Sequence, residues 1–135
     1  MADDQIRLVT NVVQQSPAMD GLRLLALFGS RASGRAHPES DWDFGYLASP
    51  GFDPDALIAM LVEHLHADRV DLVDLATASS QLRYHVARDG RVVLDRSGTE
   101  WETFWLAAVG FWCDAGPIIT AAHAAVLERL GKSAD

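Results

Sequence analysis

Two aspartates stand one residue apart in an otherwise apolar segment, "DWDFGYL", which spans residues 41–47. If this segment is a strand, Asp41 and Asp43 project to the same face, roughly 7 Å apart at the backbone. Carboxylates held in this way repel each other unless a positive charge lies between them. A Mg²⁺ ion fits, because it prefers carboxylate oxygens and leaves coordination positions for substrate phosphates. A solvated pair at a strand end is the alternative that this spacing alone leaves open.

A segment containing glycine and serine precedes the two acids and indicates what such a metal would serve. Gly29 and Ser30 directly follow the apolar run "LRLLALF", and Gly34 comes five residues after the first glycine. Glycine allows backbone N–H groups to approach phosphate oxygens, and the serine hydroxyl adds another donor. Arg31 and Arg35 flank this segment and are candidates to meet a triphosphate as cations. Solvated arginines in a loop are the alternative for both.

The spacing of the two glycines imitates a P-loop, but the residues after them do not fit that motif. Arg35 and Ala36 stand where a P-loop requires a lysine and a magnesium-binding hydroxyl. A P-loop nucleoside triphosphatase is therefore excluded.

A third acid comes from the segment "RVDLVDL", which spans residues 69–75. Asp71 and Asp74 lie three residues apart, so in a strand they project to opposite faces. If this strand neighbours the one carrying Asp41 and Asp43, one of them arrives about 5 Å across the sheet from the pair. Three carboxylates around one or two Mg²⁺ ions form a phosphoryl- or nucleotidyl-transfer centre. The remaining acid is expected to be exposed at the edge of the strand.

Alternating helices and strands must position these residues. The boundaries are set by apolar periodicity, by the cap Asp53, by Ser79 or Ser80, by the pair Ser16-Pro17 and by Gly90. Strands are predicted over residues 22–28, 41–47, 69–75 and 91–95, and helices over about 3–15, 53–67, 79–88, 100–113 and 117–130. This order predicts an α/β (α+β) fold with a small mixed central sheet of about four strands, flanked by helices. We expect one domain over residues 1–135, with a C-terminal helical pair at about residues 99–131.

Composition narrows the classes of function. The chain has 135 residues and a formal net charge of −8, which disfavours general nucleic-acid binding. No apolar stretch approaches the length of about 20 residues that a membrane helix requires. The start "MADDQIR" lacks an apolar signal core, and the single cysteine, Cys113, cannot form an internal disulfide. We therefore expect a cytoplasmic protein with no membrane association.

An aromatic stripe marks the first of the two predicted C-terminal helices. Its members recur at helical spacing and are Trp101, Phe104, Trp105, Ala108, Phe111 and Trp112. Packing in the core is one interpretation, and docking of a protein partner is the other.

The segment "GSRASGRAHPESDWDFGYL", residues 29–47, resembles the signature of the minimal nucleotidyltransferases of the DNA polymerase beta superfamily. That signature is Gly-Ser, about ten residues, and then Asp-x-Asp, and here Ser40 precedes the first acid as is usual in it. The resemblance selects Asp71 over Asp74 as the third acid, because an arginine and an apolar residue precede it. After residue 80, "VARDGRVVLD", the aromatic helix and "DAGP" more loosely resemble the MntA-type antitoxins, which pair with HEPN-domain toxins.

The resemblance implies a nucleotidyltransferase fold and the transfer of AMP from Mg²⁺-ATP to a tyrosine hydroxyl of a HEPN ribonuclease toxin, which silences the toxin. It assigns two Mg²⁺ ions to Asp41, Asp43 and Asp71, and Asp71 is also a candidate base toward the acceptor hydroxyl. The triphosphate is assigned to Gly29 and Ser30, with Arg31 and Arg35 as candidate cations beside it. Two positions depart from the family pattern: Ser33 replaces a frequent basic residue, and Gly45-Tyr46 replaces an apolar pair.

Two other functions stay open at this stage. A binding-only antitoxin would block its toxin sterically with an idle site. An adenylyltransferase for a small acceptor molecule is the second alternative, although 135 residues leave little room for the additional acceptor domain that such enzymes usually carry.

Overall fold

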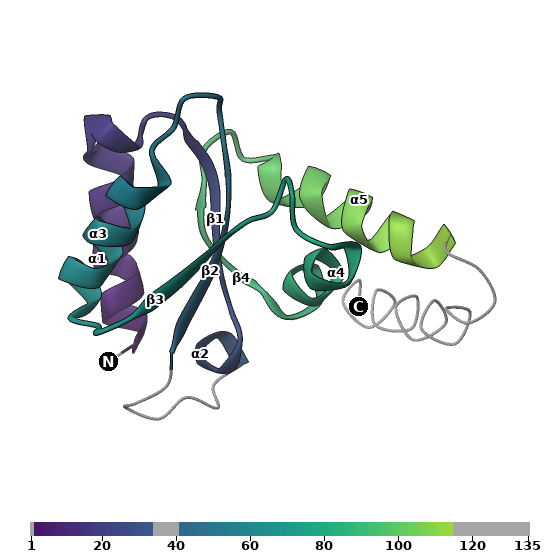
Figure 1. Cartoon of the computed structure of the whole chain (residues 1–135), viewed down its shortest axis with the longest axis horizontal. Coiled ribbons are helices and arrows are strands. Elements are labelled where there is room, and N and C mark those ends of the chain that lie inside the picture. The colour runs from purple at the N-terminus through teal and green to yellow at the C-terminus, as the bar shows by residue number, and fades with distance from the viewer. Residues whose placement is uncertain (1, 34–40, 115–135) are drawn as a thin grey trace.

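The structure is a computed structural model that describes residues 2–33 and 41–114. A four-stranded sheet forms its centre (Figure 1), with the strands in the order β3-β2-β1-β4. The strands are β1 (Leu22–Phe28), β2 (Trp42–Ala48), β3 (Val70–Asp74) and β4 (Arg91–Asp95). β1 pairs antiparallel with β2 and β4, whereas β2 and β3 run parallel. The predicted mixed sheet of four strands is thus confirmed.

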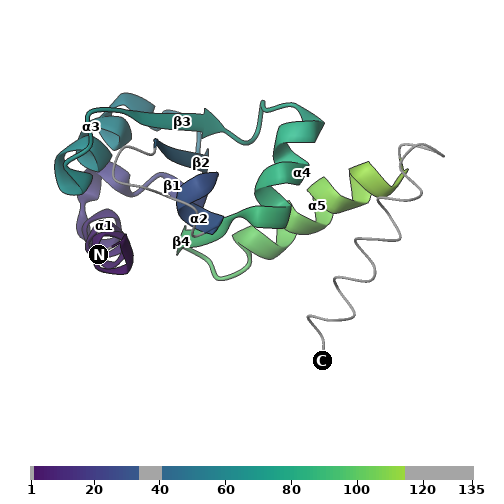
Figure 2. The ribbon, with the colours of Figure 1, turned by 90° about the horizontal axis from the view of Figure 1, so that it is seen from below.

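Helices cover both faces of the sheet. One face carries α1 (Ala2–Gln15) and α3 (Pro54–Leu65), and the other carries α4 (Ser80–Asp89) and α5 (Glu100–Asp114), as Figure 2 shows. Two short turns of helix, η1 (Pro17–Met19) and α2 (Ser30–Ser33), flank β1. Six of the seven residues of β1 are buried, as expected for a strand covered on both faces.

Two of these helices begin directly after a capping residue, Asp53 or Ser79. A side-chain oxygen of Asp53 accepts a hydrogen bond from the backbone N–H of Asp55 at 3.0 Å, at the start of α3. The hydroxyl of Ser79 accepts one from the backbone N–H of Leu82 at 3.1 Å, at the start of α4. Each bond satisfies a donor that has no partner within the helix, so both helices begin within one residue of the predicted positions.

The alternation of side chains along β2 decides which face carries its acids. Trp42 and Phe44 belong to the hydrophobic cluster beneath α1 and α3. Asp43, which lies between them in the strand, therefore projects to the opposite face, on which α4 and α5 pack. In β3, Val70 belongs to the first cluster and Leu72 packs against it, so Asp71, which lies between them, projects to the α4–α5 face as well.

Two boundaries differ from the sequence prediction, and two predicted features lie outside the described residues. The segment after Gly29 begins with the helical turn α2, in which the N–H of Ala32 donates to the carbonyl of Gly29 at 3.2 Å. β2 begins at Trp42, so Asp41 lies just before the strand. Arg35 and the predicted helix over residues 117–130 lie outside the described residues.

The aromatic stripe on α5 divides between the two interpretations. Its first members, including Trp101, Phe104 and Trp105, pack in the cluster between α4, α5 and the sheet. Phe111, in contrast, is 58% exposed. Across residues 2–33 and 41–114, no helix has the length and apolar character that crossing a membrane requires.

Candidate active site

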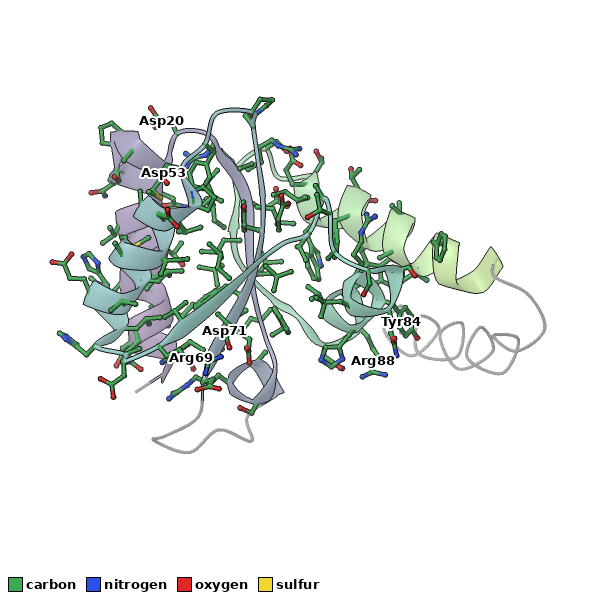
Figure 3. The ribbon with its side chains drawn as sticks, viewed as in Figure 1. Asp20, Asp53, Arg69, Asp71, Tyr84 and Arg88 are labelled. Atoms are coloured by element: carbon green, nitrogen blue, oxygen red, sulfur yellow. The ribbon has the colours of Figure 1, made fainter. Side chains whose placement is uncertain are left out.

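The register of β2 and β3 brings two of the predicted acids together. Asp43 and Asp71 are direct partners across the parallel pair of strands, and both project to the α4–α5 face. Neighbouring strands lie about 4.8 Å apart, so the two carboxyl groups are adjacent. Figure 3 shows Asp71 and Arg69 at the end of the sheet near which α2 lies.

Asp74 takes a different position. Its partner across the strands is Tyr46, and its side-chain oxygen accepts a hydrogen bond from the backbone N–H of Ala76 at 2.9 Å. This contact stabilises the turn that follows β3. Asp71, and not Asp74, is therefore the acid of β3 that lies beside Asp43.

Gly29, which begins the segment predicted to bind phosphate, lies directly against the Asp43 carboxylate. Its φ angle is +76°, in the region that residues with side chains rarely adopt. A Cβ atom at this position would lie 2.6 Å from Oδ2 of Asp43, closer than such contacts normally allow. Glycine is thus required both for the chain reversal after β1 and for the close approach of the backbone to the carboxylate.

The electrostatics of the site are dominated by the acids. Burial raises the pKa of the Asp43 carboxyl, and the negative charges of Asp71 and Asp41 and a side-chain hydrogen bond with Asp71 raise it further. Arg69 acts in the opposite direction and lowers the pKa of Asp43. Its Nε donates to Oδ1 of Asp71 at 3.2 Å. The ion pair was not singled out from the sequence, although a spacing of two residues at a strand start favours such a contact.

The acids are compatible with a hard cation but do not form a closed metal site. Among the described residues, no three His, Cys, Asp or Glu side chains are grouped so that they would hold a metal ion. Asp43 and Asp71 instead share a hydrogen bond, while Asp41 is exposed at the start of β2. Two adjacent carboxyl groups, when ionised, offer the oxygen ligands that Mg²⁺ prefers. The assignment of metal ligands stays a prediction.

Arg31 lies on the other side of the strand from the acids. Its guanidinium carbon is 4.1 Å from the centroid of the Trp42 ring, a cation–π contact that ties α2 to β2. Sequence reasoning missed this contact, because Trp42 and Arg31 are separated by ten residues whose path the pattern does not reveal. A role for Arg31 or Arg35 in binding triphosphate stays a prediction.

Gly45, which replaces an apolar residue of the family pattern, is explained by packing. A Cβ atom there would lie 2.8 Å from Cδ2 of Leu75, which is fully buried. The missing side chain therefore leaves room for Leu75 over β2, one position along the same face from Asp43.

We predict that Asp43→Asn stabilises the metal-free fold at neutral pH. The folded-state pKa of Asp43 is raised, so the native state loses stability as the pH rises from the unfolded-state pKa through the folded-state pKa. Asparagine cannot ionise and escapes this loss. Thermal unfolding in a chelator at about pH 7 should show a higher midpoint for the variant, and the difference should shrink toward about pH 4. A lower midpoint for Asp43→Asn at neutral pH would contradict this prediction, because it would mean that a neighbouring group stabilises the ionised Asp43 carboxylate.

Comparisons with known proteins agree with this geometry. The family model described as "Polymerase beta, Nucleotidyltransferase" matches residues 10–99, which include β1, β2 and β3. A protein adenylyltransferase MntA from Aphanizomenon flos-aquae is 33% identical over 95 residues, which are 62% of this chain and 63% of that protein. An MntA from Shewanella oneidensis is 41% identical over 73 residues, 52% of each chain.

A solved structure extends the similarity to nearly the whole chain. The crystal structure of a toxin–antitoxin with AMP-PNP superimposes with a TM-score of 0.63 at 26% identity, covering 94% of this chain and 98% of the other. The two MntA matches, in contrast, span less than two thirds of those relatives' own length. Together with the family match over residues 10–99, the fold and the placement of Asp43 beside Asp71 show that this chain belongs to the polymerase beta nucleotidyltransferase family.

Proposed function

We propose that this chain is an antitoxin that transfers AMP from Mg²⁺-ATP to a tyrosine hydroxyl of a HEPN-domain ribonuclease toxin and thereby neutralises it. The observation that carries the proposal is the register that sets Asp43 beside Asp71, with Gly29 against the Asp43 carboxylate. Two relatives named protein adenylyltransferase and a similar toxin–antitoxin structure with an ATP analogue support AMP transfer to a protein. The HEPN domain and the tyrosine rest on the looser resemblance to the MntA-type antitoxins after residue 80.

Each residue of the site has a role in this reaction. Asp41, Asp43 and Asp71 would hold Mg²⁺, which when bound neutralises triphosphate charge. Gly29 and Ser30 would bind the phosphates through a backbone N–H and a hydroxyl. The acceptor oxygen attacks the α-phosphorus while its proton passes to Asp71. The bond from the α-phosphorus to the bridging oxygen breaks, and pyrophosphate leaves.

The proposed use of ATP and the single cysteine, Cys113, support a cytoplasmic location.

Mass measurement of the acceptor tests the proposal. The purified chain, incubated with ATP, Mg²⁺ and the HEPN-domain protein encoded beside it, should add one or more AMP units to that protein. Peptide mapping should locate them on tyrosine, and a chelator should prevent the addition. Calorimetry should show that ATP binds with Mg²⁺ and much more weakly without it, because the acids otherwise repel the triphosphate. An unmodified toxin that is nevertheless neutralised would favour steric inhibition.

A further inference from the structure

A cavity between α4 and α5 is lined by an arginine that has one buried N–H group without a hydrogen-bond acceptor. The cavity has a volume of about 220 Å³ and is lined by Ser80, Arg83, Ala107, Ala108 and Phe111. We call these five residues the α4–α5 notch. Nε of Arg83 is buried and has no hydrogen-bond partner. A buried N–H without an acceptor costs free energy, so such groups usually have a partner in the functional state.

The apolar rim of the notch is exposed. Phe111, which lines the notch, is 58% exposed, although the aromatic residues earlier in α5 are packed. Large exposed apolar side chains that border a cavity are typical of protein-binding surfaces. Arg83 lies against the inner wall, with its guanidinium carbon 5.5 Å from the centroid of the Phe104 ring. The notch therefore offers one cationic donor beside an apolar surface.

The notch belongs to the side of the molecule that carries the acids. α4 and α5 lie side by side and cover the face of the sheet to which Asp43 and Asp71 project (Figure 2). The ring of His85, on α4, contacts that of Phe28 at 6.2 Å, and Phe28 is the strand partner of Asp43. In Figure 3, Tyr84 and Arg88 of α4 lie at about the same height as Asp71, to its right along the long axis of the molecule. A protein seated on α4 and α5 would thus border the site of transfer.

We propose that the α4–α5 notch is where the acceptor protein docks, through a carboxylate that pairs with Arg83 and a neighbouring apolar side chain that packs on Phe111. Charge complementarity favours this occupant, because a carboxylate supplies the acceptor that Nε of Arg83 lacks. A second copy of a chain with a net charge of −8 is a poorer fit, since the two copies repel. This inference rests on the proposed function, which supplies a protein acceptor.

Binding of the acceptor, separated from chemistry, tests the docking site. The Asp41→Asn, Asp43→Asn double variant serves as the parent, and calorimetry measures its affinity for the neighbouring HEPN-domain protein. Adding Arg83→Met or Phe111→Ser should weaken that affinity about tenfold each. Leu8→Ser is the matched control, because Leu8 is 47% exposed but lies on α1, on the opposite face, and it should change the affinity by less than about twofold. Arg83→Met should leave the thermal midpoint of the free chain unchanged or raise it, since it removes an unsatisfied N–H.

The outcomes separate this inference from the proposed function. If Arg83→Met and Phe111→Ser bind the acceptor as tightly as Leu8→Ser, while the native chain still modifies the toxin, the docking site is wrong and the function stands. If the parent binds no HEPN-domain protein and the native chain modifies none, both are wrong. A thermal midpoint lowered by Phe111→Ser in the free chain would mean that residues 115–135 cover the notch. A dimer that Phe111→Ser dissociates would mean that a second copy does. Either result overturns the proposal.

Discussion

Replacing Asp41 and Asp43 together by asparagine is expected to lower the rate of AMP transfer by at least about a thousandfold, the scale on which loss of charge stabilisation acts at an active site. The change removes two carboxylates that we propose as metal ligands for the developing transition state. Its effect on the fold should be small or favourable, because the pKa of Asp43 is raised by the burial and repulsion that asparagine avoids. Transfer should therefore fail in a folded protein.

Intact-mass measurement of the toxin, coexpressed with each form, checks this expectation. The toxin should gain AMP units only beside the native chain, and cells carrying the double variant should stop growing at normal antitoxin levels. The double variant Asp20→Asn, Asp55→Asn is a matched control, since it removes two exposed acids and the same charge. Full protection by Asp41→Asn, Asp43→Asn with an unmodified toxin would make the antitoxin a steric inhibitor.

Asp71→Asn should nearly abolish transfer, again by about a thousandfold, whereas Asp74→Asn should keep most of the activity. The register places Asp71 next to Asp43, while the Asp74 side chain accepts a hydrogen bond in the following turn. An asparagine oxygen at position 74 can accept the same bond, so that substitution preserves the turn. The two variants therefore form a pair with the same chemical change in the same strand.

Initial rates of AMP incorporation into the toxin, measured at saturating ATP, distinguish the two variants. Thermal unfolding of each protein should show that both are folded at the assay temperature. The opposite ranking, with Asp74→Asn inactive and Asp71→Asn active, would contradict the assignment of the third acid to the face shared with Asp43.

The sequence alone determined most of the local elements and predicted which residues carry the chemistry. The uninterrupted apolar run of β1 predicted a strand covered on both faces, and the caps Asp53 and Ser79 set the starts of α3 and α4. These signals lie within a few residues of the backbone groups they satisfy, so they are readable without the fold. The spacing of Asp41 and Asp43, and the glycine and serine before them, likewise indicated a phosphate and metal site.

Only the tertiary structure decided how these pieces meet. The order β3-β2-β1-β4, with β2 and β3 parallel, sets Asp71 rather than Asp74 beside Asp43. It also brings the backbone of Gly29 against the Asp43 carboxylate and leaves Phe111 exposed on α5, whereas Phe104 in the same helix is buried. Strand pairing and helix packing join residues far apart in the chain, and their outcome depends on which competing arrangement buries more apolar surface. No window of neighbouring residues contains that comparison, which is why the pattern left these contacts open.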